Sequence, residues 1–232
     1  KGVIQANDLN ELLDYASILT QKKKVNGNRV AIITISGGAG VMMADKCEEN
    51  GLTLAEFSPK TESGLKDVLP AFASVKNPVD VTAQAVGDPG LFGKALDICL
   101  KDDQSDVLVI YLGLLKETGL GIAKRIAETA ASTDKPLVVI WVAGPQDAIQ
   151  ELKRNKIAVF EEPIRGIKSV GKLVGYRLFV KNYKEHTGTA AYKEGEENYC
   201  ELKQWLSAIA QKRKSLSEFE ARRVLQEFDI PL

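Results

Sequence analysis

Blocks of apolar and polar positions alternate along most of this chain, and their spacing predicts strands and helices in turn. Apolar runs that predict strands occupy residues 30–35, 52–57, 107–112, 137–142 and 158–160. Helical spacing predicts helices over residues 40–50, 58–69, 89–101, 119–132, 145–155 and 163–180. The runs VLVIYL and LVVIWV are apolar throughout, so both faces of these strands need cover. We therefore predict an α/β fold, a doubly wound, mostly parallel sheet of the flavodoxin or Rossmann kind.

The two ends of the chain differ from this alternating region. Near the start, residues 8–23 predict a helix with a polar back face, since apolar residues recur at helical spacing at Leu9, Leu12, Leu13, Ala16 and Leu19. Residues 183–199 are polar and charged, which is typical of a linker, and 202–210 predict a short helix. A last amphipathic helix follows, with a capping box at Ser215 and Glu218 or at Ser217 and Glu220. We expect three parts, namely a helix and linker over 1–26, the α/β domain over 27–182, and a linker into a further domain over 183–232.

Composition and charge narrow the function classes. Lys plus Arg and Asp plus Glu both number 31, and this zero net charge argues against a nucleic-acid binder. No apolar run approaches the roughly 20 residues that span a bilayer, and no secretory segment is present. The three cysteines show neither metal-ligand nor disulfide spacing. We expect a cytoplasmic protein without nucleic acid, membrane or metal partners. Because the chain starts without Met and stops just after a helical pattern, we also expect a piece of a longer polypeptide.

The most informative segment is the glycine turn, Ser-Gly-Gly-Ala-Gly at residues 36–40. It separates a predicted strand from a predicted helix, so the first N–H groups of that helix are free to bind an anion. The P-loop motif is absent, and Met43 stands where a dinucleotide fingerprint needs glycine or alanine. The alternative is a plain turn whose glycines serve backbone angles and close helix–sheet packing.

A second candidate segment is Asn77-Pro78-Val79-Asp80. Pro78 fixes the backbone and pushes Asn77 into an extended conformation, which places Asp80 near a strand end, where open α/β sheets bind ligands. The alternative is a loop in which Asn77 and Asp80 satisfy local backbone groups. The one histidine, His186, lies in the predicted linker, and we expect it to be solvated. No pattern predicts a catalytic acid, base or nucleophile.

Three stretches, GNRVAIITISGGAGVMMAD, LPAFASVKNPVDVTAQA and VLVIYL, closely resemble the NDP-forming acyl-CoA synthetases. That family includes the ADP-forming acetyl-CoA synthetases and is related to succinyl-CoA synthetase. The tail LSEFEARRVLQEFDIPL is similar to the opening of the family's ATP-grasp domain. The resemblance implies a flavodoxin-like CoA-ligase domain. It also implies a reaction that interconverts acyl-CoA, nucleoside diphosphate and phosphate with acid, CoA and nucleoside triphosphate through a phosphohistidine.

The resemblance also implies roles for particular residues. A phosphate-binding helix start is implied at Ser36, Gly37, Gly38, Ala39, Gly40 and Val41. A second loop beside the phosphate is implied at Asn77, Pro78 and Asp80. The family's phosphorylated histidine would lie upstream of this chain. His186 echoes its motif only superficially, because a position after the flavodoxin-like domain is wrong for that role.

The implied partners are acyl-CoA, nucleotide and phosphate, together with CoA-binding and ATP-grasp domains that this chain lacks. CoA, ATP or ADP, and Mg²⁺ would be bound by the whole enzyme and none by this fragment alone; a homo-oligomer is also compatible. Two other functions stay open. The same domains could form a regulatory, ligand-sensing module of a protein acetyltransferase. A nicotinamide-dependent oxidoreductase is disfavoured by Met43.

Overall fold

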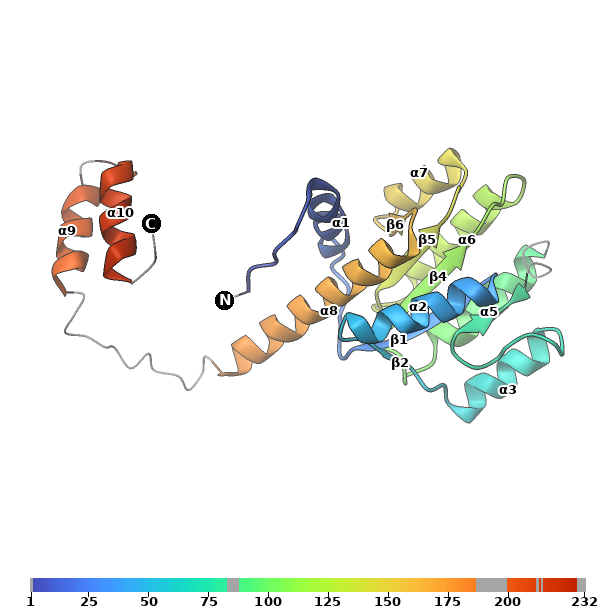
Figure 1. Cartoon of the computed structure of the whole chain (residues 1–232). Coiled ribbons are helices and arrows are strands. Elements are labelled where there is room, and N and C mark those ends of the chain that lie inside the picture. The colour runs from blue at the N-terminus through green and yellow to red at the C-terminus, as the bar shows by residue number, and fades with distance from the viewer. Residues whose placement is uncertain (1, 83–87, 187–199, 212, 214, 229–232) are drawn as a thin grey trace. The chain divides into compact units, whose positions relative to one another are not determined.

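A computed structural model describes residues 2–82, 88–186, 200–211, 213 and 215–228, and the chain divides into two units, Lys1–Tyr183 and Lys184–Leu232 (Figure 1). The first unit is built on a six-stranded parallel sheet. Its strands are β1 (Arg29–Thr34), β2 (Thr53–Leu54), β3 (Val79–Asp80), β4 (Val107–Leu112), β5 (Leu137–Trp141) and β6 (Ala158–Phe160). The strand order β2-β1-β4-β5-β6, with β3 also paired to β1, is the flavodoxin-like order with one short strand added. The predicted fold is therefore confirmed.

Helices cover both faces of this sheet (Figure 1). One layer consists of α1 (Leu9–Leu19), α2 (Gly37–Glu49) and α8 (Pro163–His186). The other consists of α3 (Pro59–Val68), α5 (Pro89–Leu100), α6 (Gly119–Ala131) and α7 (Gln146–Arg154). Along β1, Val30 and Ile32 pack in the first layer, while Ala31 and Ile33 pack in the second. This two-sided burial is why the strand reads as a continuous apolar run.

Short strands divide one edge of β1 between them. β2 pairs with its amino end, Arg29 and Val30, and β3 pairs with its carboxyl end, Ile33 and Thr34. The strand predicted over 52–57 is thus only two residues long in the structure. The next residue, Ala55, still donates its N–H to the Val30 carbonyl at 2.9 Å, but the Asn77 side chain donates to the same carbonyl and accepts the Ile32 N–H, and the pairing goes no further.

Two helix boundaries differ from the prediction in ways that matter for function. Helix α2 begins at Gly37 rather than near residue 40, so the glycines form its first turn. Helix α8 continues to His186 rather than ending near residue 180, so the start of the predicted linker is helical. The rest of that predicted linker, residues 187–199, lies outside the described residues.

The second unit contains α9 (Cys200–Ala210) and α10 (Glu218–Glu227). Ser217 and Glu220 form the capping box at the start of α10, one of the two predicted pairs. The guanidinium of Arg223 lies 4.8 Å from the centre of the Trp205 ring and so links the two helices. In the part of the chain that the structure describes, we find no helix of the length and apolarity needed to traverse a bilayer.

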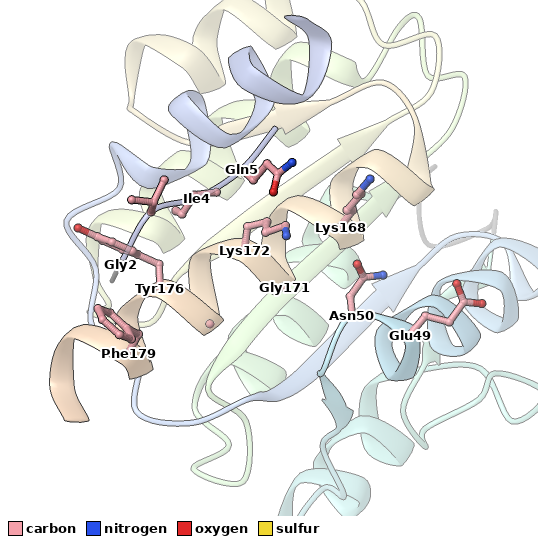
Figure 2. Close-up of a pocket in the computed structure, with 12 residues that line it drawn as sticks. Gly2, Ile4, Gln5, Glu49, Asn50, Lys168, Gly171, Lys172, Tyr176 and Phe179 are labelled. Carbon is pink, nitrogen blue, oxygen red and sulfur yellow. The ribbon is translucent and has the colours of Figure 1, made fainter. Parts of the chain in front are cut away.

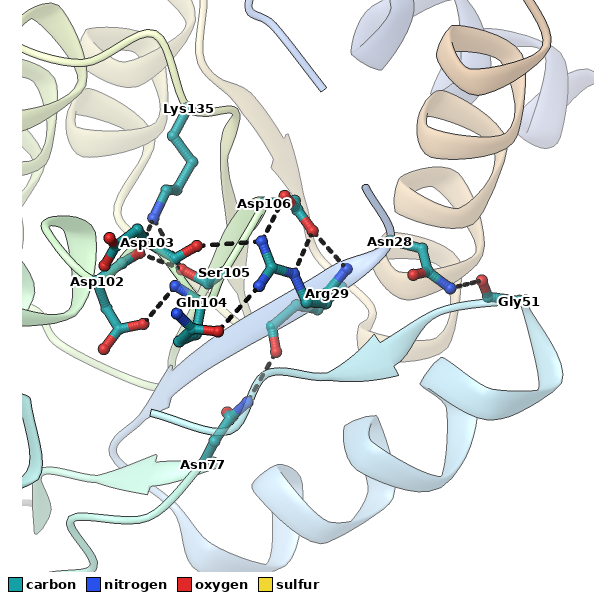
Figure 3. Close-up of polar contacts among 11 residues, drawn as sticks. Asn28, Arg29, Gly51, Asn77, Asp102, Asp103, Gln104, Ser105, Asp106 and Lys135 are labelled. Atoms are coloured by element: carbon teal, nitrogen blue, oxygen red, sulfur yellow. Dashed lines mark hydrogen bonds and ion pairs between the residues drawn. The ribbon is translucent and has the colours of Figure 1, made fainter. Parts of the chain in front are cut away.

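A cluster of polar side chains lies at the amino ends of the strands β1, β4 and β5 (Figure 3). The Arg29 guanidinium donates to both carboxylate oxygens of Asp106, at 2.9 and 3.1 Å, and the Arg29 backbone N–H donates to the same group at 3.0 Å. Nearby, the Lys135 ammonium donates to the carbonyls of Leu100 and Asp102 and to Ser105 Oγ. These charged groups join the starts of β1, β4 and β5, at the opposite end of the strands from the glycine turn. We therefore interpret them as stabilising the fold and not as part of a functional site.

We predict that Asp106→Asn lowers the free energy of unfolding by about 2 kcal/mol, since charge-assisted hydrogen bonds are weakened. Burial raises the pKa of the Asp106 carboxyl, but the hydrogen bonds and charge of Arg29 outweigh it and hold this pKa below its ordinary value. Such a carboxyl stabilises the fold above its unfolded-state pKa and loses this effect as pH falls through the folded-state value. In urea unfolding, the gap between wild type and variant should narrow below about pH 4. A gap that stays constant down to about pH 3 would contradict this role.

Candidate functional site

The glycine turn lies at the switch point of the sheet, where the chain order reverses between β1 and β4. The Thr34 hydroxyl shapes it from within, because it donates to the Ser36 carbonyl at 2.8 Å and accepts the Ser36 N–H at 2.9 Å. Thr34 is fully buried and sets the direction in which the chain leaves the strand. Sequence reasoning did not select this residue, although a threonine two positions before Ser-Gly is a usable signal for such a turn.

The first turn of α2 is open to solvent. Ser36 is its N-cap, yet its side chain makes no capping hydrogen bond, and no acidic residue stands in that turn. Gly37 and Gly38 are exposed, and a Cβ added at Gly38 would meet no atom within 4 Å. The first turn of α2 therefore presents backbone N–H groups that no side chain of this helix covers. We call this exposed first turn, at Ser36, Gly37 and Gly38, the mouth.

The six residues of the predicted helix start do not share one environment. Ala39 and Gly40 are buried against the sheet, whereas Val41 is 63% exposed on the next turn. Ser36, Gly37 and Gly38 border the mouth itself. An anion at this mouth would be contacted by backbone groups, since these residues offer little side chain.

Gly40 joins the two predicted motifs. A Cβ at this position would lie 3.1 Å from Thr34 Cγ2 and 3.2 Å from Pro78 Cβ, which is tighter than ordinary packing. The Asn77–Pro78 peptide bond is cis. The distances at Gly40 place Pro78 beneath the first turn of α2, and the two segments meet although more than 35 residues separate their centres.

Asp80 lies at the mouth of the turn. Its Oδ1 accepts the Thr82 N–H at 2.9 Å, and its Oδ2 lies 3.1 Å from the place that a Cβ of Gly37 would take. The pairing of β3 with β1 puts Asp80 beside Thr34, at the carboxyl end of the strand. A carboxylate therefore stands next to the start of α2, where the helix dipole favours negative charge.

Asn77 has a different position. Its Oδ1 accepts the Ile32 N–H at 2.9 Å, and its Nδ2 donates to the carbonyls of Val30 at 2.7 Å and Ala55 at 3.0 Å. These groups lie between the end of β2 and the start of β3, where the amide side chain replaces strand pairing. The polar atoms of Asn77 are thus used by backbone groups that are 22 to 47 residues away in the chain, and not by the local groups of the loop alternative above.

A cavity of about 570 Å³ lies elsewhere, between the N-terminal segment, helix α8 and the end of α2 (Figure 2). Glu49 and Asn50 line it, at the opposite end of the 13-residue helix from the glycine turn. At about 1.5 Å of rise per residue, roughly 18 Å of helix separates the two ends. This cavity is therefore distinct from the mouth at Gly38.

Other reactive groups are not gathered at the mouth. Burial raises the pKa of the Cys47 thiol to about 12 and also raises the pKa of Cys99, so neither is a thiolate near neutral pH. Within residues 2–82, 88–186 and the described part of the second unit, no set of three or more His, Cys, Asp or Glu side chains could hold a metal ion.

Residues 30–162 match the family model of the Ligase-CoA domain. The chain is 34% identical over 171 residues to subunit alpha of the ADP-forming acetate–CoA ligase II of Pyrococcus furiosus. This match covers 70% of this chain and 36% of the relative. The chain is 29% identical over 242 residues to the ADP-forming acetate–CoA ligase of Methanocaldococcus jannaschii, which covers all of this chain and 33% of the relative.

Among solved structures, the chain is similar to the dinucleotide-forming acetyl-coenzyme A synthetase 1 of Ca. Korarchaeum cryptofilum in complex with phosphate and ADP. The TM-score is 0.69 at 27% identity, and the match covers 78% of this chain and 40% of that one. This chain thus spans less than half the length of each of these three relatives.

We predict opposite effects for alanine at two neighbouring glycines of α2. Gly40→Ala should lower the free energy of unfolding by about 1–3 kcal/mol, because the new methyl group presses on Thr34 and Pro78. Gly38→Ala meets open space and should be neutral or stabilising by up to about 1 kcal/mol, since alanine is the better helix former. Urea unfolding of the two variants makes the comparison, and equal stabilities would show that Gly40 is not a packing glycine.

Proposed function

The chain belongs to the Ligase-CoA domain family, and from this premise we propose that it is the ligase domain of an ADP-forming acyl-CoA synthetase. The complete enzyme would convert acyl-CoA, ADP and phosphate into acid, CoA and ATP through a phosphohistidine. In this proposal the chain contributes the start of α2 as a binding site for the phosphoryl group. The single observation that carries this role is the open first turn, with Gly38 facing free space at the switch point.

Electrostatics supports a phosphoryl ligand. A phosphoryl group carries about two negative charges, and unpaired N–H groups at a helix start stabilise such charge together with the dipole. Favourable helix-start interactions contribute about 0.3–2 kcal/mol, depending on burial. Because Gly37 and Gly38 carry no Cβ, phosphoryl oxygens can approach the backbone closely.

The Asp80 carboxylate refines the choice of ligand. It lies beside Gly37, so a free phosphate at the mouth would meet a like charge. A phosphoryl group attached to an imidazole differs, because the second ring nitrogen can donate a hydrogen bond to a carboxylate. The arrangement therefore favours a phosphohistidine over inorganic phosphate, and in this proposal the Asp80 carboxylate orients the ring.

The remaining ligands fall to the rest of the enzyme. In this proposal the histidine, the CoA site and the site for ATP or ADP with Mg²⁺ are supplied by domains or a subunit outside this chain. The relative from Pyrococcus furiosus is named as subunit alpha of its enzyme, so that protein is one subunit of a larger assembly. The open turn of α2 is what this chain would add to that assembly.

We predict that Gly38→Val in the complete enzyme lowers phosphohistidine formation by about 100-fold or more, since the branched side chain would stand in the mouth and displace the oxyanion from its donors. Phosphohistidine is measured with γ-labelled ATP, and CoA binding by calorimetry should be unchanged. Because the space at Gly38 is empty, the variant should fold normally.

Gly175→Val is the matched control, since Gly175 is also exposed within a helix and an added Cβ there meets nothing within 4 Å. It should form phosphohistidine at the wild-type rate. Normal phosphohistidine formation by the Gly38→Val enzyme would refute the proposed role of α2.

A further inference from the structure

Helix α1 turns its apolar side to solvent. Leu9, Leu12 and Leu13 are 77%, 54% and 69% exposed, and Ala16 is exposed as well. The spacing of these four residues puts them on one side of the helix. We call this set, Leu9, Leu12, Leu13 and Ala16, the leucine stripe.

The opposite side of α1 holds it on the domain. Tyr15 and Ile18 are buried there, at 3% and 0% exposure. Arg165 of α8 donates to both carboxylate oxygens of Asp14, at 2.8 and 2.9 Å, and Lys168 of α8 pairs with Glu11. The hydrogen bond from Lys168 lowers the pKa of Glu11 to about 2, so this pair stays ionised at neutral pH.

These contacts fix the orientation of the stripe. A surface helix ordinarily turns its apolar residues to the core, but α1 buries Tyr15 and Ile18 and also turns a second apolar set, the leucine stripe, to water. Figure 2 places Lys168 on α8, next to the segment that leads into α1. A contiguous apolar surface that is held outward by ion pairs is a surface built for contact.

We propose that the leucine stripe docks another part of the same acyl-CoA synthetase, an inference that rests on the function proposed above. The match to the Methanocaldococcus jannaschii enzyme extends through the whole chain, α1 included, and yet covers only 33% of that enzyme. The enzyme therefore contains further protein to cover the stripe. Since Glu11 and Asp14 are already paired with Lys168 and Arg165 on the inward side, the stripe offers only apolar side chains, and the docked surface should be apolar.

A second copy of this chain suits the stripe less well. A stable interface between separate molecules uses about 20–30 residues a side, and the stripe offers four. A part of the same enzyme needs fewer contacts, because attachment or assembly through other surfaces raises its effective concentration to about the millimolar range. The size of the stripe thus favours docking within one enzyme.

The test compares Leu12→Glu/Leu13→Glu with Asn10→Glu/Ser17→Glu, in this chain alone and in the complete enzyme. Both double variants add two charges to exposed positions of the same helix, but only the first pair lies on the stripe. Amide exchange of α1 should be at least about tenfold slower in the complete enzyme than in the isolated chain. The stripe variant should abolish this difference, and the control variant should retain it.

Equal exchange of α1 in the chain and in the enzyme would overturn the proposal, as would equal effects of the two double variants. Light scattering tests whether a second copy of the chain covers the stripe instead. If the isolated chain is a dimer and Leu12→Glu/Leu13→Glu dissociates it, the partner is a second copy and the proposal is wrong. The readout is independent of phosphoryl transfer. Gly38→Val should leave α1 protection intact, so failure of the docking proposal and failure of the proposed function are separately visible.

Discussion

Pairing along both edges of β1 is the constraint on which the rest of the domain depends. One edge is bonded to β4 over its length, from Val30 to Thr34. The other is shared by β2, the Asn77 side chain and β3 in succession. Because every backbone group of a buried strand needs a partner, this succession lets two strands of two residues replace one long neighbour. The same strand then leads directly into the helix start at the candidate site.

That arrangement explains why the two motifs act together. Asn77 anchors the second segment to the middle of β1, and this anchoring sets Pro78 under Gly40 and Asp80 beside Gly37. The structural role of Asn77 and the positional role of Asp80 are thus parts of one device. A change at Asn77 would reach the mouth through Pro78 without the amide touching any ligand.

Much of the fold could be predicted from the sequence, because the spacing of apolar residues in helices and the continuous apolar runs in strands both follow from which side chains are buried. The strands VLVIYL and AVF have the predicted bounds, and the family resemblance carried by the glycine turn and the Asn-Pro-Val-Asp segment is confirmed by the match over residues 30–162. The length of β2 could not be predicted, since a side chain 22 residues away from Ala55 ends it. Local propensity contains no information about such a long-range partner.

The outward side of α1 shows the same limit from another direction. Periodicity identifies an apolar stripe at Leu9, Leu12, Leu13 and Ala16, but it does not say which neighbour the stripe faces. Here Arg165 and Lys168, more than 150 residues away in the chain, hold the acidic side of α1 inward. Exposed partner pairs of this kind contribute modestly to stability, yet their geometry suffices to choose between two orientations of a short helix. The choice leaves the apolar side free, as expected if further protein in the enzyme supplies the missing half of its packing.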